Sequence, residues 1–185
     1  MNSPVPFDEL NALIAGLSIH FEDGKIRSEQ DKEDIIDEML DLFLLAAANG
    51  SAQANEDLGT DYHLGIKTVT DIVDREVAGK TWRDRVNEYY ENGGTLGDIA
   101  RIAETETHRD ANEASFVTAR KSGATSKVWH CSMLPTSRDS HIYLDGVTAP
   151  IDGEFYSING GSTKFPGEWG IAEEDCGCLC WLTYK

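Results

Sequence analysis

Hydrophobic side chains recur every three or four residues over the first two thirds of the chain, which is the spacing of amphipathic helices. The spacing begins at Phe7 and continues to Leu17, and it returns between Ile35 and Leu44. Ser28 supplies an N-cap for the second stretch, and Asn49-Gly50 supplies a stop signal. We therefore predict helices over 7–17 and 28–49, followed by a polar loop over 51–60.

Three further helices follow from the same pattern. Apolar residues from Ile66 to Val77 predict a helix that ends near Gly79. Thr81 caps a helix that Gly93-Gly94 ends, and Thr95 caps the longest one, which runs to about residue 122. A helix of that length spans on the order of 40 Å, so it is either a spine of the fold or a projecting arm.

The helical period disappears after Gly123, where Pro, Gly, Trp and Tyr become frequent. Alternating residues predict strands over 127–134, 154–158 and 176–184, and a hairpin over 141–151 with Asp145-Gly146 in its turn. The predicted fold class is α+β: a helical N-terminal two thirds with one long helix, then a small antiparallel β-sheet module.

The charge balance narrows the possible partners. The formal net charge is −17, and residues 1–80 and 81–185 are both acidic. We expect no tight binding to DNA or RNA, because neither half has the basic surface that phosphate contacts require. No apolar run is long enough for a membrane span, the N-terminus does not resemble a signal peptide, and the clustered cysteines favour a reducing compartment.

The ordered set of motifs over residues 81–180 resembles the Mu F-like phage head morphogenesis family, whose members are minor head (minor capsid) proteins. A Glu/Thr/Arg-rich helix is followed by a Trp-bearing strand, an Arg-Asp-x-His element that leads into Leu-Asp-Gly, a Pro-Gly loop, and an acidic residue before paired cysteines. Here these are 101–115, Trp129, Arg138, Asp139, His141, Leu144-Asp145-Gly146, Pro150, Phe155, Pro166-Gly167, Glu173, Glu174, Cys176 and Cys178.

The resemblance implies a virion component without catalytic residues, made in the host cytoplasm and located in the phage head or at its portal vertex. It implies a variable helical region over 1–80 that contacts the portal or the major capsid protein, and a Mu F-like α+β domain over 81–185. Such proteins act in head morphogenesis and in DNA packaging or ejection. The alternatives are a toxin-like nuclease or transferase built on the same C-terminal module, and a zinc-binding adaptor.

The cysteines leave two main interpretations open, with a disulfide as a third. His141, Cys176 and Cys178, with Cys131 or Cys180 as a fourth ligand, would form a mixed Cys/His zinc site. On the predicted last strand, Cys176, Cys178 and Cys180 would share one face. Alternatively, reduced cysteines are small apolar side chains that fill a core.

The Arg-Asp-x-His element also has a structural use. Arg138 and His141 are expected to hydrogen-bond Glu173, Glu174 or Asp175, which would fix the hairpin to the final segment. A Ser140–His141 nucleophile pair is not expected, because neighbours on a strand point to opposite faces. His108, four residues after Glu104, is expected to pair with it on the surface.

The helix after Thr81 carries a possible partner-binding set. Aromatic and arginine side chains are favoured at interfaces, and packing on the long helix is the competing explanation. The set is Trp82, Arg83, Arg85 and Tyr89.

Overall fold

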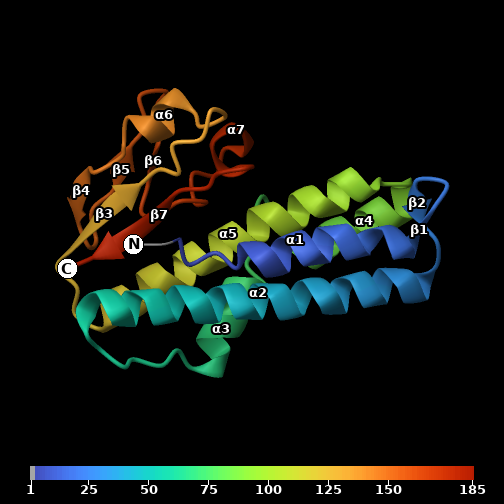
Figure 1. Cartoon of the computed structure of the whole chain (residues 1–185), viewed down its shortest axis with the longest axis horizontal. Coiled ribbons are helices and arrows are strands. Elements are labelled where there is room, and N and C mark those ends of the chain that lie inside the picture. The colour runs from blue at the N-terminus through green and yellow to red at the C-terminus, as the bar shows by residue number, and fades with distance from the viewer. Residues whose placement is uncertain (1–2) are drawn as a thin grey trace.

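The computed structural model describes residues 3–185 and has the predicted α+β organisation, with helices first and small antiparallel sheets at the C-terminus (Figure 1). Two long helices, α2 and α5, lie side by side along most of the molecule, and the shorter helices cover them. The helical elements of this layer are α1 (Phe7–Gly16), the 3-10 turn η1 (Leu17–His20), α2 (Glu29–Leu58), α3 (Ile66–Val73), α4 (Trp82–Asn92) and α5 (Leu96–Lys121).

The predicted caps begin the helices where the sequence indicates. The hydroxyls of Ser28, Thr81 and Thr95 accept hydrogen bonds from the backbone three residues later. Thr81 and Thr95 complete capping boxes with Asp84 and Asp98. A short hairpin of β1 (Phe21–Glu22) and β2 (Lys25–Ile26) joins η1 to α2. Helix α3 ends at Val73, earlier than predicted, and an isolated bridge between Val77 and Lys80 follows it.

The predicted stop at Asn49-Gly50 and the loop over 51–60 are wrong. Helix α2 continues through Gly50 to Leu58, and Gly59, with φ of 64° in the left-handed region, is the C-cap that follows it. At Gly50 a Cβ would lie 1.9 Å from the carbonyl oxygen of Ala111 on α5. The glycine therefore serves the close approach of two helices and does not end one of them.

The helical layer has a core that draws on both sides of residue 80. Leu17, Ile35, Met39 and Phe43 pack with Trp82, Val86 and Ile99 in one hydrophobic cluster. Trp82 is fully buried, and its ring meets the edge of Phe43 at a centroid distance of 5.0 Å. The regions 1–80 and 81–185 thus share a core.

The C-terminal module is built on a three-stranded antiparallel sheet with strand order β4-β3-β7. The central strand β3 pairs Val128 with Thr148 of β4 on one side and with Thr183 of β7 on the other. Strands β5 and β6 form a separate two-stranded antiparallel sheet. The elements of the module are β3 (Ser126–His130), α6 (Asp139–Ile142), β4 (Thr148–Pro150), β5 (Phe155–Tyr156), β6 (Ser162–Thr163), α7 (Ala172–Asp175) and β7 (Trp181–Tyr184).

Two predicted elements of this module are partly wrong: only β4 of the predicted hairpin and only the second half of the predicted last strand form. Residues 139–142 form the one-turn helix α6, so no hairpin spans 141–151. Asp145-Gly146 still forms a turn, with Gly146 at φ of 76°, but it connects α6 to β4. The last strand begins only at Trp181, and residues 176–180 form a loop. Both segments take their shape from contacts with each other, which local alternation does not encode.

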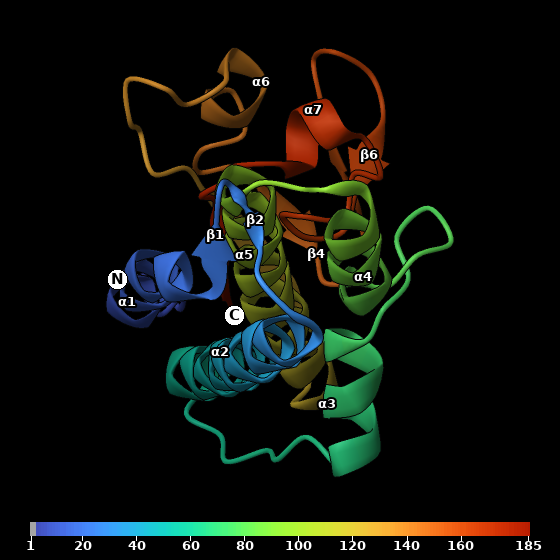
Figure 2. The ribbon, with the colours of Figure 1, turned by 90° about the vertical axis from the view of Figure 1, so that its right-hand side faces the viewer.

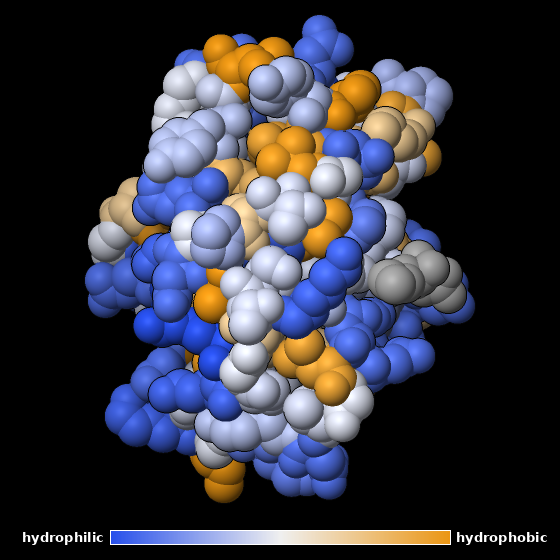
Figure 3. Space-filling model, turned by 90° about the vertical axis from the view of Figure 1, so that its left-hand side faces the viewer, coloured by the Kyte–Doolittle hydropathy of each residue, from blue (hydrophilic) through white to orange (hydrophobic). Residues whose placement is uncertain are grey.

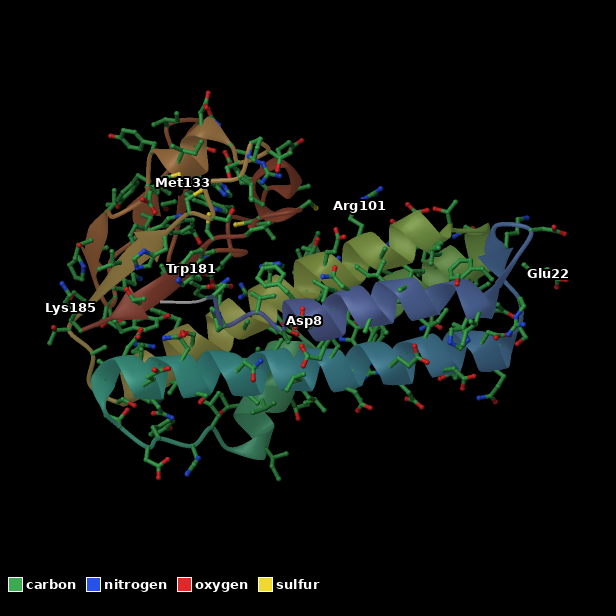
Figure 4. All side chains as sticks on the ribbon, viewed as in Figure 1. Asp8, Glu22, Arg101, Met133, Trp181 and Lys185 are labelled. Atoms are coloured by element: carbon green, nitrogen blue, oxygen red, sulfur yellow. The ribbon has the colours of Figure 1, made fainter. Side chains whose placement is uncertain are left out.

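The module sits on one end of the helical layer (Figure 1), and the view along the layer shows it above α5 (Figure 2). The backbone N–H of Tyr184 on β7 donates to Asp57 Oδ2 on α2 across 3.1 Å, and the Asn112 amide on α5 donates to the carbonyl of Cys180 across 3.1 Å. In Figure 4, Glu22 marks the far end of the helical layer and Lys185 the end that carries the module. Helix α5 is therefore a spine shared by both parts.

A candidate metal-binding site between His141 and the C-terminal cysteines

His141 is buried between a carboxylate and two thiols. Its Nε2 lies 2.9 Å from Glu174 Oε2, and its Nδ1 lies 3.5 Å from Cys178 Sγ and 3.4 Å from Cys180 Sγ. A carboxylate only accepts hydrogen bonds, so Nε2 carries the proton of the neutral ring. The Nδ1 lone pair is then directed at the two sulfur atoms.

Glu174 is held in place by a set of donors. Its two carboxylate oxygens accept from the Ser140 hydroxyl at 2.9 Å, the Asn159 amide at 3.1 Å and the Ser157 hydroxyl at 3.4 Å, in addition to His141. Burial on its own would raise the pKa of Glu174. The hydrogen bonds from Asn159 and Ser140 and the nearby His141 outweigh burial and lower it. Glu174 is therefore a fixed anion behind the imidazole.

The two thiols affect each other strongly. A hydrogen bond from Cys180, assisted by His141, lowers the pKa of the Cys178 thiol below its ordinary value. The same contact with Cys178, together with burial, raises the pKa of Cys180. Burial would lower the pKa of His141, but the hydrogen bond to Cys178 and the charges of Cys178 and Glu174 raise it. The pKa values of Cys178, Cys180 and His141 are therefore linked through the mutual contacts of these groups.

The loop that carries the cysteines is fixed by polar contacts at its start. The Arg138 guanidinium donates to the carbonyl of Cys176. The carboxylate of Asp175 accepts from the backbone N–H groups of Trp169 and Gly170 at 2.9 and 2.8 Å. Between Cys176 and Cys178 the chain reverses at Gly177, whose φ is 67°. This turn brings Cys178 and Cys180 to the same side.

Aromatic rings and a small cavity complete the surroundings. His141 stacks against Trp169 at a centroid distance of 6.2 Å and meets Trp129 edge-on at 6.0 Å. A cavity of about 20 Å³ borders His141, and the Cys and His residues in its wall are Cys131, His141, Cys178 and Cys180. The cavity has room for one water molecule or one metal ion, and it is too small for an organic substrate.

The structure brings some of the predicted site residues together and separates others. His141, Glu174, Cys178 and Cys180 converge, and Arg138 supports them. Cys176 contributes its carbonyl to Arg138 while its side chain lies outside the cluster of ligating atoms, and Glu173 is exposed. The prediction that three cysteines share a strand face is wrong, because the segment is a loop.

The other motif residues have structural positions. Trp129 is fully buried in the module core, Asp139 opens α6, and Gly146 donates its N–H to the Trp129 carbonyl. Asp145 Oδ1 accepts from the backbone N–H of Cys131 at 2.9 Å. This contact fixes the residue that follows β3 beside the cavity.

Trp82, the first residue of the predicted partner-binding set on α4, is not on the surface. Trp82 is fully buried. Arg83 lies over its ring and pairs with Asp74, and Arg85 pairs with Glu106. Tyr89 packs against the helical core. Packing of α4 within the helical layer accounts for Trp82 and Tyr89, and a partner-binding role for Arg83 and Arg85 stays a prediction.

Sequence reasoning missed a buried polar group in the middle of α5. Arg109 Nη2 lies 2.5 Å from Glu106 Oε2 and 3.2 Å from Asp110 Oδ1, and all three side chains are almost fully buried. Arg75 connects this face to the module by pairing with Glu113 and Glu168 at 3.0 and 3.1 Å. The sequence of α5 carries charged residues on every side of the helix, which indicates that some of them are buried. The apolar pattern alone does not reveal this.

His108 corrects another prediction. It is buried instead of lying on the surface, and it packs edge-on against Phe7 at a centroid distance of 5.4 Å. Burial lowers its pKa to about 4. A surface pair with Glu104 is therefore wrong, and His108 is a neutral core side chain.

Cys178, His141 and Glu174 follow one another in space as a thiol, an imidazole and a carboxyl group, which is also the order in cysteine hydrolases. Cys178 is 3% exposed, and the adjoining cavity holds no more than a water-sized group. Ser140 donates to the same Glu174 oxygen that binds His141, so its hydroxyl is directed to the carboxylate. The chemistry that fits this closed cluster is the binding of a thiophilic metal ion.

Comparison with known proteins connects the chain to phage heads. It is 38% identical over 93 residues to the minor head protein GP7 of Bacillus phage SPP1, a match that covers 49% of this chain. A weaker match, 25% identical over 146 residues and 60% of this chain, is to the NAD(+)–arginine ADP-ribosyltransferase EFV of Enterococcus faecalis. The chain spans 30% of the length of each of these curated relatives.

No family model matches the chain, and no solved structure matches it significantly. Within residues 3–185, none of the helices has both the length and the apolar character needed to cross a bilayer. The similarity to the SPP1 minor head protein, over about half of this chain, therefore supports a phage head protein.

Proposed function

We propose that this chain acts as a minor head protein of a tailed bacteriophage, in head morphogenesis and in DNA packaging or ejection, and that it belongs to the Mu F-like family its motifs resemble. The observation that carries the proposal is the 38% identity to the SPP1 minor head protein. The module described above is consistent with it, since its polar motif residues hold the fold together around a cavity of only about 20 Å³.

In this proposal residues 1–80 contact the partner proteins, and residues 81–185 form the Mu F-like domain, which includes the C-terminal module. The partners are the portal protein and the major capsid protein of the same phage. Exposed aliphatic side chains support a contact in the N-terminal region: Ile66 is 87% exposed and Ile19 is 62% exposed. Such side chains gain free energy when a partner covers them.

Co-expression with the portal protein of the same phage tests this assignment. We expect the two proteins to co-purify, and Ile66→Asp to reduce the amount of this chain recovered with the portal. Tyr156→Asp, at a side chain 68% exposed on the C-terminal module, is the matched control and should leave recovery unchanged. Recovery that falls with Tyr156→Asp and not with Ile66→Asp would place the contact on the other part.

The acidic surface fits a location next to packaged DNA without tight binding to it. Both halves are acidic, with a total of −17, which opposes contact with phosphates. The free protein is expected to show no measurable DNA binding at about 150 mM salt. A complex with duplex DNA at that salt concentration would contradict this part of the proposal.

A second candidate function is a transferase or nuclease that uses the same module, and the similarity to the ADP-ribosyltransferase favours the transferase form. Incubation with NAD⁺ and an arginine-containing acceptor tests it directly. Transfer that survives Ile66→Asp but is lost with a folded His141 variant would favour this candidate over the structural role.

A further inference from the structure

We propose that Cys131, His141, Cys178 and Cys180 bind one structural zinc ion that closes the C-terminal module. The inference is independent of the head-protein assignment, since it rests on the chemistry of four side chains. Each supplies a ligand type that zinc prefers, and Cys₃His is among the usual sets of structural zinc sites.

Three of the ligating atoms are already assembled. His141 Nδ1 and the sulfur atoms of Cys178 and Cys180 all lie within 4.8 Å of one another, and all three residues are buried. Tetrahedral ligands at zinc distances of roughly 2.0–2.3 Å are separated by less than about 4 Å, so a small contraction of the cluster is enough. The two sulfur atoms come from one loop and the nitrogen from α6, so the ion would join two segments.

The fourth ligand comes from the wall of the adjoining cavity. Cys131 is 6% exposed and is the remaining Cys or His side chain that borders this space of about 20 Å³. Its backbone is fixed by Asp145, which accepts its N–H at 2.9 Å. Zinc would then connect the end of β3 as well, and the cavity is where the ion lies.

The surroundings of His141 are those of a metal ligand. Its far nitrogen donates to Glu174, and this carboxylate is itself fixed by Ser140 and Asn159. Histidines that bind metals commonly donate their other N–H to a carboxylate, which sets the tautomer and the ring orientation. A histidine that only filled a core would not need an ordered anion behind it.

The geometry also assigns which cysteines take part. The turn at Gly177 separates the side chain of Cys176 from the cluster and directs Cys178 and Cys180 into it. When zinc binds, each participating thiol loses its proton to solvent, and His141 binds as the neutral ring through Nδ1. The ion with three thiolates and one imidazole carries a net charge of −1, which Arg138 partly offsets from the cavity wall.

Metal analysis of the purified, reduced full chain is the first test. We expect close to one equivalent of zinc per chain, released when a mercurial reagent blocks the thiols. Cobalt(II) added to the zinc-free chain should give the thiolate charge-transfer absorption and the visible bands of a tetrahedral site. A reduced wild-type chain that retains no zinc and gives no such cobalt spectrum overturns the proposal, and it would identify the cysteines as packed thiols.

Single substitutions provide the matched comparison. Cys178→Ser and Cys180→Ser should lose the zinc and the tetrahedral cobalt spectrum, whereas Cys176→Ser should retain both. Glu174→Gln should weaken zinc affinity by about 10–100-fold. Retention of wild-type zinc by Cys180→Ser, or loss of zinc with Cys176→Ser in a folded chain, would contradict the assignment, and the wild-type cobalt spectrum stays decisive if a variant does not fold.

Discussion

The imidazole of His141 and the carboxylate of Glu174, 33 residues apart in sequence, meet across 2.9 Å and join α6 to α7. Ser140 donates to the same oxygen, and Arg138 holds the adjoining loop through the carbonyl of Cys176. The two segments dense in polar residues are therefore one unit. The sequence predicted that both Arg138 and His141 would contact one of three carboxylates. His141 contacts Glu174, whereas the prediction for Arg138 is wrong, since its guanidinium donates to a backbone carbonyl.

Replacement of Glu174 by alanine should destabilise the fold by about 3 kcal/mol, since it leaves the buried donors of Ser140 and His141 without their acceptor and removes the hydrogen bond from Asn159. Urea unfolding followed by circular dichroism measures this change. The neighbouring Glu173→Ala is the control, because that side chain is exposed and its loss should change stability by less than about 0.5 kcal/mol. Equal effects of the two substitutions would contradict the role given to Glu174.

A methyl group at Gly50 should disrupt the contact between α2 and α5. The Cβ of Gly50→Ala would lie 1.9 Å from the Ala111 oxygen, so the helices must separate, at a cost of about 1–3 kcal/mol or more. Gly16→Ala is the matched control: it has helical φ and nothing within 4 Å of the added atom. Thermal unfolding should show a lower Tm for the first variant and an unchanged or higher Tm for the second.

The turn at Gly177 should tolerate asparagine better than alanine. With φ of 67° and open space around the added Cβ, Gly177→Ala pays only backbone strain, about 1 kcal/mol. Gly177→Asn should cost less, because asparagine adopts this conformation more readily. Denaturant midpoints of the two variants check the order, and a larger loss for asparagine would show that space and not backbone conformation limits the site.

Stability should rise with pH above about 8 because of Lys127. This side chain is fully buried over the rings of Phe116 and Phe155, and burial, with the charge of Lys164, lowers its pKa to about 8. The unfolded chain holds the proton up to about 10.4 and the folded chain releases it earlier, so between these values the unfolded state binds more protons and stability increases with pH.

The rise should amount to about 1–3 kcal/mol between pH 8 and pH 10. Urea unfolding across this range measures it, and Lys127→Met, which retains an apolar chain of similar length, is the control. The difference in unfolding free energy between the two proteins should shrink as the pH rises. A difference that stays constant would mean that Lys127 is charged in the folded state throughout.

The sequence predicted the helix starts correctly, because they depend on residues that are close together in the chain. The caps at Ser28, Thr81 and Thr95 and the apolar faces behind them are short-range features, and the helices begin where those features indicate. Gly50 misled the prediction because glycine favours both a helix end and a close helix contact. Only the position of Ala111, 61 residues away, decides between these uses.

The sequence predicted that the candidate site combines histidine and cysteine side chains, but it did not predict which cysteines take part. A four-residue helix such as α6 has little stability of its own, and its contacts with Glu174 determine it. An alternating Cys-x-Cys-x-Cys sequence favours a strand, whereas the turn at Gly177 and the hydrogen bond from Asn112 to Cys180 impose a loop. The choice of Cys180 over Cys176 follows from that loop.

The C-terminal module exposes apolar side chains next to polar ones. On the face shown in Figure 3, hydrophobic residues gather more densely in the upper part, which is the module, than over the helical layer below. The most exposed are Tyr143, Tyr156, Ile158 and Met133.

The protein content of purified phage heads tests the central claim most directly. Heads from the phage that encodes this chain, separated from free protein and from tails on a density gradient, can be analysed by quantitative mass spectrometry. The account predicts this chain in a fixed ratio to the portal protein in the head fraction. Heads that are complete and infectious but contain none of it would contradict the assignment.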